Sequence, residues 1–493
     1  MLHFALERAL RNRSNTAIID TTGAHTYQHL IDDSARIAAE LLNGRASLEG
    51  QRIAFLITPG YPWVATQWGI WRAGGIAVPL PMNSARPELT YILEDTQAAT
   101  LVTDEANAAQ VEGLGPHLIR YDQIPQGAAT LPVIEAHDRA MILYTSGTTS
   151  KPKGVVTTHA NIAAQVTSLM TAWEWTADDR IVLCLPLHHV HGIVNVVCCA
   201  LWAGATCYTL PRFNADRIWD LIGDEALTLL MAVPTVYVKL TVAWETYPEA
   251  RRAQLTAAAR KLRLMVCGSA ALPVSTLQRW RELTGHTLLE RYGMTEIGMA
   301  LSNPLQGDRI PGSVGRPLPQ VEVRLTNEDG TLTPPGTPGE IEVRGPNVFL
   351  EYWRRPEATH AAFRDGWFRT GDTAVVDDGV YRILGRTSID ILKSGGHKIS
   401  ALEIEEVLRT HPAIAECAVV GLPDSEWGER VAAVLVLQAT HSLDLETLRA
   451  WARDHLANHK LPSRLLVVEA LPRNAMGKVV KPNLVSLFQT DAN

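Results

Sequence analysis

Hydrophobic positions in the first half of the chain alternate between helical spacing and short unbroken runs. The helical patterns cover 32–42 and 63–73, and the strand-like runs are 52–56, 76–80 and 100–103. The same alternation returns over 180–210 and 227–266. It predicts a mostly parallel sheet that helices cover on both faces. Trp68 and Trp71 follow the helical spacing, so we expect both to pack in the core.

The pattern changes at Val314. Short β-like runs at 321–325 and 339–344 are separated by turns rich in proline and glycine, such as TPPGTPG at 333–339. Short strands with frequent turns of this kind are typical of antiparallel sheets. We therefore expect an antiparallel, β-barrel-like sub-domain here.

A third pattern follows the strand-like run 380–384. Helices are expected at 401–410 and 445–456, and strands at 416–420 and 430–437. We place a domain boundary after Gly385. The predicted fold class is α/β, with a large N-terminal domain (residues 1–385) of parallel αβαβα-type sheets plus the barrel-like sub-domain. A small α+β C-terminal domain (residues 386–493) completes it.

Length and composition narrow the class of protein. A chain of 493 residues is too long for one ordinary core, and its 46% hydrophobic and 20% charged residues are those of a globular protein. A net charge of −7 argues against a nucleic-acid partner. The six cysteines show no Cys-x-x-Cys spacing, which favours buried free thiols over disulfides or a zinc site.

The start of the chain contains an acidic residue and lacks a long apolar core, so we expect a short amphipathic helix rather than a secretory signal. The apolar stretch 193–201 is too short to span a bilayer, so no stable membrane insertion is expected. The expected location is the cytoplasm, or an organellar matrix if a targeting segment was removed. The sequence makes no prediction of oligomeric state.

Residues 144–154 read YTSGTTSKPKG, a segment unsuited to a regular helix or strand. Gly147 and Gly154 allow backbone angles closed to other residues, and Pro152 removes an amide donor. Such a loop can present amides and hydroxyls to a polyanion, with Lys151 or Lys153 as the cation. The Walker A pattern is absent, and on its own this segment fits a solvated turn equally well.

Seven further motifs follow this loop. They are LPLHHVHG (185–192), GSAAL (268–272), RYGMTE (291–296), GEIEVRGP (339–346), WFRTGD (367–372), GRTSIDILKSGGHKIS (385–400) and PRNAMGK (472–478). In this order the eight motifs resemble the adenylate-forming superfamily of acyl-CoA synthetases, peptide-synthetase adenylation domains and luciferases. The resemblance runs from about Thr26 to Lys481. One departure is Ser150, where the family usually has glycine.

The resemblance implies an ATP site. The residues expected at the β- and γ-phosphates are Thr145, Ser146, Gly147, Thr148, Thr149 and Lys153. Those expected around adenine are Gly268, Ser269 and Ala270, with Tyr292 and Gly293, and Met294 is also expected to bind the nucleotide. Asp372 would accept hydrogen bonds from both ribose hydroxyls, and Arg386 would meet the ribose or phosphate at the domain junction.

The resemblance also implies catalytic roles in joining a carboxylate to ATP. Glu296 would hold Mg²⁺, the expected metal, and Thr295 would contact the α-phosphate. Lys478 would bridge the substrate carboxylate and the AMP oxygens. These groups would neutralise the charge that develops as pyrophosphate leaves.

The second half-reaction needs a CoA thiol in place of Lys478. By resemblance, a mobile C-terminal domain rotates about a hinge near Ser388. Lys393 would then face the site, and Gly395 and Gly396 would line the channel for the pantetheine arm of CoA.

Arg291 is the residue that indicates the acid. A guanidinium is costly in a pocket for a fatty tail alone, but it pairs bidentately with a second carboxylate. His191 could donate to the same carboxylate, and His189 matches the family residue that gates the acyl site. The alternative is structural: Arg291 would pair with a neighbour such as Glu290 or Asp308.

Two longer stretches, 302–319 and 385–405, look closest to malonyl-CoA and methylmalonyl-CoA synthetases. We predict an AMP-forming acid-thiol ligase that makes malonyl-CoA or methylmalonyl-CoA from the acid, ATP and CoA through an acyl-adenylate. The alternatives are a medium- or long-chain fatty acyl-CoA synthetase, a stand-alone adenylation enzyme that loads a carrier protein, and a nucleotide-binding regulator that has lost catalysis.

Overall fold

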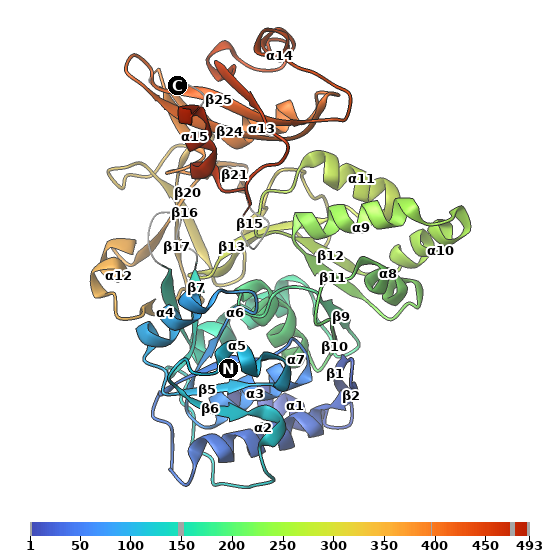
Figure 1. The fold of residues 1–493 in the computed structure, drawn as a ribbon, viewed down its shortest axis with the longest axis vertical. Coiled ribbons are helices and arrows are strands. Elements are labelled where there is room, and N and C mark those ends of the chain that lie inside the picture. Colours follow the sequence, from blue (N-terminus) through green and yellow to red (C-terminus); the bar gives the residue numbers. More distant parts are fainter. Residues whose placement is uncertain (1, 146–151, 396, 474–478, 491–493) are drawn as a thin grey trace.

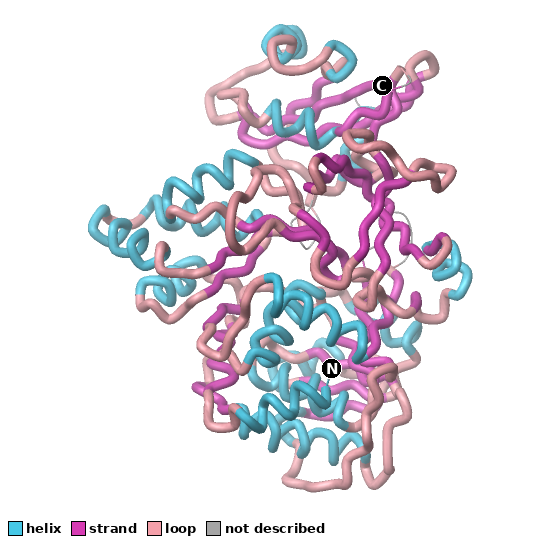
Figure 2. The backbone as a smooth tube through the Cα atoms, turned by 180° about the vertical axis from the view of Figure 1, so that it is seen from behind, coloured by secondary structure: helices cyan, strands magenta, loops and turns pink. Residues whose placement is uncertain are grey.

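The structure is a computed structural model that describes residues 2–145, 152–395, 397–473 and 479–490. In Figure 1 the first part of the chain lies at the bottom, an antiparallel sub-domain lies above it, and the C-terminal elements lie at the top. Seen from behind, helices cover the lower and lateral parts, while the middle part consists largely of strands (Figure 2).

Two large sheets form the lower part. The seven-stranded sheet has the order β18-β8-β7-β4-β3-β5-β6. Its strands are β3 (Arg52–Leu56), β4 (Ile76–Pro79), β5 (Thr100–Thr103), β6 (His117–Arg120), β7 (Arg139–Thr145), β8 (Lys153–Thr158) and β18 (Glu351–Tyr352). The five strands from β7 to β6 run parallel, whereas β8 and β18 pair antiparallel.

The nine-stranded sheet has the order β15-β14-β13-β12-β11-β9-β10-β1-β2. Its strands are β1 (Thr16–Asp20), β2 (Gly23–Thr26), β9 (Arg180–Leu183), β10 (Thr206–Thr209), β11 (Leu229–Ala232), β12 (Leu264–Cys267), β13 (Leu289–Met294), β14 (Gly298–Ser302) and β15 (Arg316–Pro317). Strands β1 and β9 to β13 are parallel, and the strands at both edges are antiparallel. The predicted parallel sheets are therefore confirmed, with antiparallel edges that the pattern did not reveal.

Helices cover these sheets as the alternating pattern predicts. They are α1 (Leu2–Arg11), α2 (Tyr27–Leu42), α3 (Tyr61–Arg72), α4 (Arg86–Thr96), α5 (Ala108–Val111), α6 (His159–Ala172), α7 (Cys199–Ala203), α8 (Ala215–Gly223), α9 (Pro234–Thr246), α10 (Glu249–Ala259) and α11 (Val274–Thr284), with a π-helical segment at His191–Cys198 and 3₁₀ turns at Glu105–Asn107 and Tyr121–Gln123. Trp68 and Trp71 on α3 are fully buried, so their predicted place in the core is confirmed.

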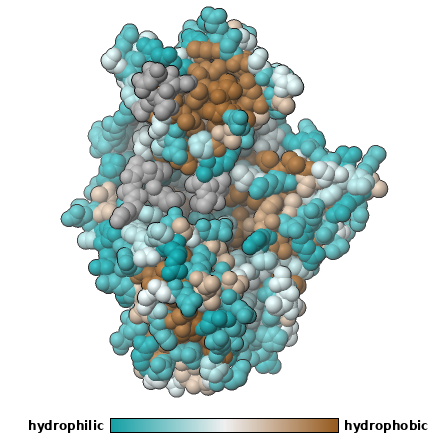
Figure 3. Space-filling view, in the orientation of Figure 1, coloured by the Kyte–Doolittle hydropathy of each residue, from teal (hydrophilic) through white to brown (hydrophobic). Residues whose placement is uncertain are grey.

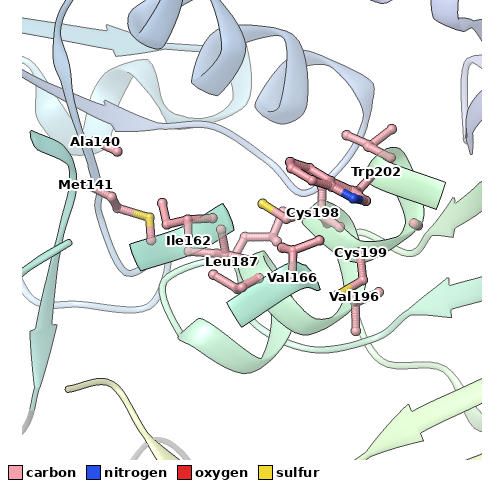
Figure 4. Close-up of a cluster of buried hydrophobic side chains, with 14 of the residues drawn as sticks. Ala140, Met141, Ile162, Val166, Leu187, Val196, Cys198, Cys199 and Trp202 are labelled. Carbon is pink, nitrogen blue, oxygen red and sulfur yellow. The ribbon is translucent and has the colours of Figure 1, made fainter. Parts of the chain in front are cut away.

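The largest core lies between the two sheets. Figure 4 shows Met141 of β7, Ile162 and Val166 of α6, and side chains of the π-helical segment packed together. Helix α6 begins at a capping box, in which the side chains of Thr158 and Asn161 accept each other's backbone N–H. The cap turns the chain sharply after β8, so that α6 can lie between the sheets.

The barrel-like prediction corresponds to a five-stranded antiparallel sheet. Its elements are β16 (Glu322–Thr326), β17 (Gly339–Arg344), β19 (Phe363–Arg364), β20 (Trp367–Asp377), β21 (Val380–Arg386) and α12 (Pro356–Ala362). Strand β20 is long and is central to this sheet, because it pairs with β17, β19 and β21.

The C-terminal elements form an α+β unit, as predicted. They are β22 (Ile391–Ser394), β23 (His397–Ser400), α13 (Ala401–Leu408), β24 (Ile414–Asp424), β25 (Gly428–Leu437), α14 (Leu445–Ala452), a 3₁₀ turn at Asn458–Lys460, β26 (Arg464–Val467) and α15 (Lys481–Thr490). Figure 3 shows hydrophobic side chains gathered on this unit, at the top of the view.

All six cysteines are free, and five of them are buried, as expected. Among the described residues, no helix has the length and apolar character needed to cross a bilayer.

Candidate active site

Asp372 occupies the centre of a hydrogen-bonded group at the top of the N-terminal part. The Tyr292 hydroxyl donates to its Oδ2 at 2.6 Å, and Arg386 Nε donates to its Oδ1 at 3.0 Å. The register of β20 and β21 sets Asp372 opposite Arg386, and β13 supplies Tyr292. The structure thus brings together three of the residues expected at the nucleotide.

The charges in this group support one another. Burial acts against the charge of Arg386, but Asp372, with smaller contributions from Tyr292 and Glu296, outweighs burial and raises the pKa of Arg386. Burial and the neighbouring Asp372 carboxylate raise the pKa of Tyr292 well above its ordinary value, so this tyrosine remains a hydroxyl donor. Thr370 adds a backbone carbonyl that accepts from Arg386 Nη2 at 3.2 Å. Two side-chain donors therefore hold the Asp372 carboxyl group in a fixed orientation.

Glu296 lies in the turn between β13 and β14 and faces β18. The Tyr352 hydroxyl donates to its Oε1 at 2.9 Å, and the Lys153 ammonium lies 4.9 Å from the centre of the Tyr352 ring. Burial raises the pKa of Glu296, although the hydrogen bond from Tyr352 opposes this effect. One tyrosine thus joins the carboxylate expected to hold the metal to the lysine expected at the phosphates.

The surroundings of Glu296 fit a magnesium ion that is shared with phosphate. Among the described residues, no group of three or more His, Cys, Asp or Glu could hold a metal by itself. Glu296 is a buried carboxylate whose burial disfavours its negative charge, so a cation beside it would be stabilised. Mg²⁺ commonly takes one or two carboxylates and completes its shell with substrate phosphates and water.

Arg291, His191 and Ser269 form a second group. The Ser269 hydroxyl lies 3.2 Å from His191 Nδ1, and it lies 3.3 Å and 3.4 Å from the two terminal nitrogens of Arg291. The loop after β12 supplies Ser269, β13 supplies Arg291, and His191 begins the π-helical segment. The structure therefore unites Arg291 with His191, as expected for an acid pocket.

Arg291 is 3% exposed, and none of the carboxylates in the described part of the chain forms an ion pair with it. Burial lowers its pKa to about 10, so the group remains charged at neutral pH. The alternative pairing with Glu290 or Asp308 is not observed. Adjacent residues on a strand point to opposite faces, and Glu290 instead accepts from the Gly312 N–H at 3.0 Å.

His191 is buried about as deeply as Arg291. Burial, Arg291 and His189 together lower its pKa well below the ordinary value, so the ring is neutral. Its Nε2 is buried without a hydrogen-bond partner in the described part of the structure. Arg291 and His191 together leave buried donor capacity of the kind that a ligand carboxylate would satisfy.

The model of the AMP-binding enzyme family matches residues 6–353, and the model of the AMP-binding enzyme C-terminal domain matches residues 403–478. The chain belongs to the AMP-binding enzyme family. The resemblance expected from the eight motifs is thereby confirmed.

This AMP-binding enzyme is similar to a CoA ligase from mouse and to two solved structures of bacterial enzymes. It is 47% identical to the mouse mitochondrial malonate–CoA ligase ACSF3, over 97% of this chain and 89% of the relative. Its fold matches ATP-bound MatB from Rhodopseudomonas palustris with a TM-score of 0.89 at 34% identity, covering 99% of this chain and 100% of the other. It also matches the Bacillus subtilis o-succinylbenzoate CoA synthetase MenE in complex with ATP and a magnesium ion, with a TM-score of 0.85 at 29% identity over 98% of each chain. The predicted fold class is confirmed.

Several other predicted residues of the AMP-binding enzyme lie in the loops and strands beside these groups. Gly268 is packed so closely that an added Cβ would lie 2.6 Å from an Arg291 nitrogen, and Ala270 follows Ser269 in the same loop. The Ser269 side chain contacts His191 and Arg291, so a loop expected at adenine also touches the residues expected at the acid. His189 lies beside His188, with ring centres 4.1 Å apart.

Gly293 and Met294 end β13, and Thr295 follows them in the turn that holds Glu296. Thr145 ends β7, and its hydroxyl lies 3.5 Å from the Lys153 carbonyl oxygen. The turn and the end of β7 therefore place these predicted residues beside the Glu296 group.

Two predicted residues of the C-terminal unit are not brought to these groups. Lys393 Nζ lies 4.0 Å from a Glu328 oxygen, and both side chains are exposed. Gly395 has a φ of 54° and lies against Trp427, where an added Cβ would meet the indole at 2.9 Å. The other predictions fall outside the described residues: Ser146, Gly147, Thr148 and Thr149 of the phosphate loop, Gly396, and Lys478.

Tyr352 is the site residue that sequence reasoning missed. It stands outside the eight motifs, six residues after GEIEVRGP, and its partner Glu296 is 56 residues away in the sequence. The short run Glu351–Tyr352 pairs with β8 and so carries the tyrosine to Lys153, the lysine expected at the phosphates. Only that pairing reveals the contact.

Proposed function

We propose that this chain is an ATP-dependent malonate–CoA ligase. It joins malonate and ATP into malonyl-adenylate with release of pyrophosphate, and then transfers the malonyl group to the CoA thiol with release of AMP. The family match makes it an AMP-forming acyl-CoA synthetase, and the mouse relative is a malonate–CoA ligase. That relative is mitochondrial, which supports the organellar-matrix alternative for the location.

One observation carries the choice of acid. Arg291 is a buried guanidinium whose side-chain partner is the neutral Ser269 hydroxyl. An uncompensated buried charge is costly, and a carboxylate of the substrate would neutralise it. Malonate has two carboxylates, so one can pair with Arg291 and accept from His191 Nε2 while the other reacts with ATP. A fatty acid supplies only the reacting carboxylate.

The groups around ATP support adenylate formation. Asp372 would accept hydrogen bonds from the ribose hydroxyls, with Arg386 beside it, and Lys153 would approach the phosphates. Glu296 would hold Mg²⁺, which supplies positive charge to the phosphate oxygens when it is bound. With both substrates fixed, the malonate oxygen attacks the α-phosphorus and the bond to pyrophosphate breaks. Lys478 would bridge the two reacting groups at this step.

The second step requires a different surface at the same site. We assign residues 1–385 to an N-terminal domain and 386–493 to a C-terminal domain that rotates near Ser388. Lys393 now lies beside Glu328, which fits the arrangement before that rotation. Afterwards Gly395 and Gly396 would admit the pantetheine arm, and the CoA sulfur would attack the malonyl carbonyl and displace AMP.

A pyrophosphate-release assay with acetate, malonate, methylmalonate, succinate and octanoate, in the presence of CoA, tests the proposal. We expect malonate to give the highest kcat/KM. Arg291→Met should lower kcat/KM for malonate by about 100-fold, because a buried charge pair contributes about 3 kcal/mol, and it should leave octanoate unchanged or improved.

The same assay decides between the alternatives. Highest activity on octanoate, with malonate activity unaffected by Arg291→Met, would mean a fatty acyl-CoA synthetase. Adenylation without CoA thioester formation would mean an enzyme that loads a carrier protein. Binding of ATP with no pyrophosphate release from any acid would mean a regulator.

A further inference from the structure

A buried lysine of the C-terminal unit is held between two carboxylates next to the predicted hinge. Lys481 Nζ lies 2.6 Å from Asp390 Oδ1 and 2.8 Å from Glu405 Oε1. Lys481 and Glu405 are 8% and 4% exposed. Burial acts against the ammonium charge, but the two carboxylates outweigh it and raise the pKa of Lys481. The lysine therefore remains charged within the fold.

The position of Lys481 makes this arrangement notable. It is the first residue of α15, and a positive charge at a helix N-terminus is disfavoured by the helix dipole. A buried lysine there is stable only because Asp390 and Glu405 surround it. The lysine thus fixes the start of α15 to one particular place on the rest of the unit.

Asp390 connects this place to the hinge turn. Its Oδ2 accepts from the Arg386 N–H at 3.0 Å, and its own N–H donates to the Arg386 carbonyl at 2.7 Å. Gly385 is so close that an added Cβ would lie 2.3 Å from Asp390 Cβ. The Arg386 side chain in turn holds Asp372. One carboxylate therefore links the start of α15 to the strand that carries the nucleotide-site arginine.

Glu405 connects the same lysine to the body of the unit. Its Oε1 also accepts from the Val419 N–H at 2.9 Å, and its Oε2 accepts from Arg409 at 3.0 Å. Helix α13 and strand β24 are thereby joined to α15 through one buried group. Every partner of the Glu405 carboxylate named here belongs to the C-terminal unit, so this side of the anchor moves with it.

We propose that Lys481 is a positioning residue, which holds the segment after the PRNAMGK motif against the hinge turn so that Lys478 is presented for adenylation. This inference rests on the proposed function. Lys478 precedes Lys481 by three residues, a distance of at most about 10 Å along the chain. Anchoring Lys481 to Asp390 and Glu405 therefore confines the reach of Lys478 when the C-terminal unit is docked.

The two half-reactions separate this role from a merely structural one. Lys478 is used in adenylation and not in thioester formation, so Lys481→Met should slow pyrophosphate release by about 10- to 100-fold, the cost of misplacing a reacting group by about 1 Å. Formation of malonyl-CoA from supplied malonyl-adenylate should stay within about threefold, which also shows that the unit is folded. Lys481→Arg should recover part of the lost adenylation rate.

Arg449→Met is the matched control. Arg449 is a cation of the same unit, on α14, and it donates to the Pro462 carbonyl far from the hinge turn. It should change neither half-reaction selectively. Asp390→Asn provides a second route to the same selective loss if Lys481→Met proves unstable in a thermal melt.

Equal losses in both half-reactions for Lys481→Met and Asp390→Asn, or no loss in either, would overturn the positioning role. The wild-type enzyme separates this result from the choice of acid. If it adenylates another acid in place of malonate, the proposed substrate is wrong. The comparison of half-reactions is then made with the acid that it accepts.

Discussion

Asp372 and Arg291 hold charge inside the protein in opposite ways. Asp372 has Tyr292 on one oxygen and Arg386 on the other, so its charge is balanced before any ligand arrives. Within the described part of the chain, Arg291 has only neutral hydrogen-bond partners, Ser269 among them. We relate the balanced charge of Asp372 to the nucleotide, which is the same in every cycle. We relate the unpaired charge of Arg291 to the acid, which must be selected by its own charge.

Asp372→Asn tests the nucleotide assignment. The amide can accept at only one position and has no charge, so we expect kcat/KM for ATP to fall by about 10- to 100-fold, in line with about 1.5–3 kcal/mol for a hydrogen bond to a charged group. Steady-state kinetics with varied ATP measures this. Asp377→Asn, at the exposed end of the same strand, is the control, and equal effects of the two substitutions would contradict the assignment.

Residue types at the site could be predicted where a motif contains them. The motifs RYGMTE, WFRTGD and GRTSID identified Arg291, Asp372 and Arg386, and the structure brings Asp372 and Arg386 together. Their partners were harder to predict. The contact of Ser269 with Arg291 and the contact of Tyr352 with Glu296 depend on strand pairing, which a linear pattern does not contain.

The hairpin of β13 and β14 is the element on which both halves of the site depend. Arg291 and Tyr292 lie on β13, and Glu296 lies in its turn. The strands approach so closely at the turn that an added Cβ on Gly293 would lie 2.0 Å from the Gly298 carbonyl oxygen. Glycine is required here because the partner is backbone and cannot move aside.

Gly293→Ala should therefore distort the turn and displace Glu296. We expect a loss of stability of about 1–3 kcal/mol from overpacking, together with at least a 100-fold loss in the rate of pyrophosphate release. Urea unfolding and the adenylation assay measure the two effects. Gly127→Ala, whose nearest contact would lie at 4.0 Å, should change neither, and wild-type activity in Gly293→Ala would refute the requirement.

At the level of elements, periodicity predicted most helices and parallel strands. Residues 32–42 and 52–56 fall within α2 and β3, whose burial patterns repeat the hydrophobic pattern of the sequence. The antiparallel edges β8, β14 and β15 and the π-helical segment at His191–Cys198 were not predicted. A strand's direction depends on which neighbour it meets, and a π-helix has no simple sequence periodicity.

The junction between the N-terminal part and the C-terminal unit contains facing carboxylates. Glu406 of α13 accepts from the Val274 N–H at the start of α11, at 3.3 Å. Glu290 is buried nearby, bonded to the Gly312 N–H, and Glu406 adds to the effect of burial on it. Burial first, and Glu406 in addition, raise the pKa of Glu290 to about 8.

Stability should therefore depend on pH through Glu290. The unfolded carboxyl ionises near its ordinary pKa of 4.5, whereas the folded one keeps its proton up to about pH 8. The unfolded state thus loses its proton first, and stability falls as pH rises across that window, by at most about 1.4 kcal/mol per pH unit. Thermal midpoints of wild type and Glu290→Gln from pH 5 to pH 8 should diverge, with the variant flatter.

Glu282→Gln is the control for this comparison, because its carboxylate is exposed on α11 and pairs with Arg279. It should follow the wild-type curve. Parallel curves for wild type and Glu290→Gln would show that Glu290 ionises in the folded protein as it does in water.

The contact proposed for Arg291 has a consequence for turnover. The carboxylate that it would hold is not consumed: it is present in malonate, in the adenylate and in the thioester alike. Binding that is equal at every stage lowers KM without raising kcat. The guanidinium would therefore bind malonyl-CoA as tightly as it binds malonate. Release of the product, rather than the chemical steps, would then limit the rate of turnover.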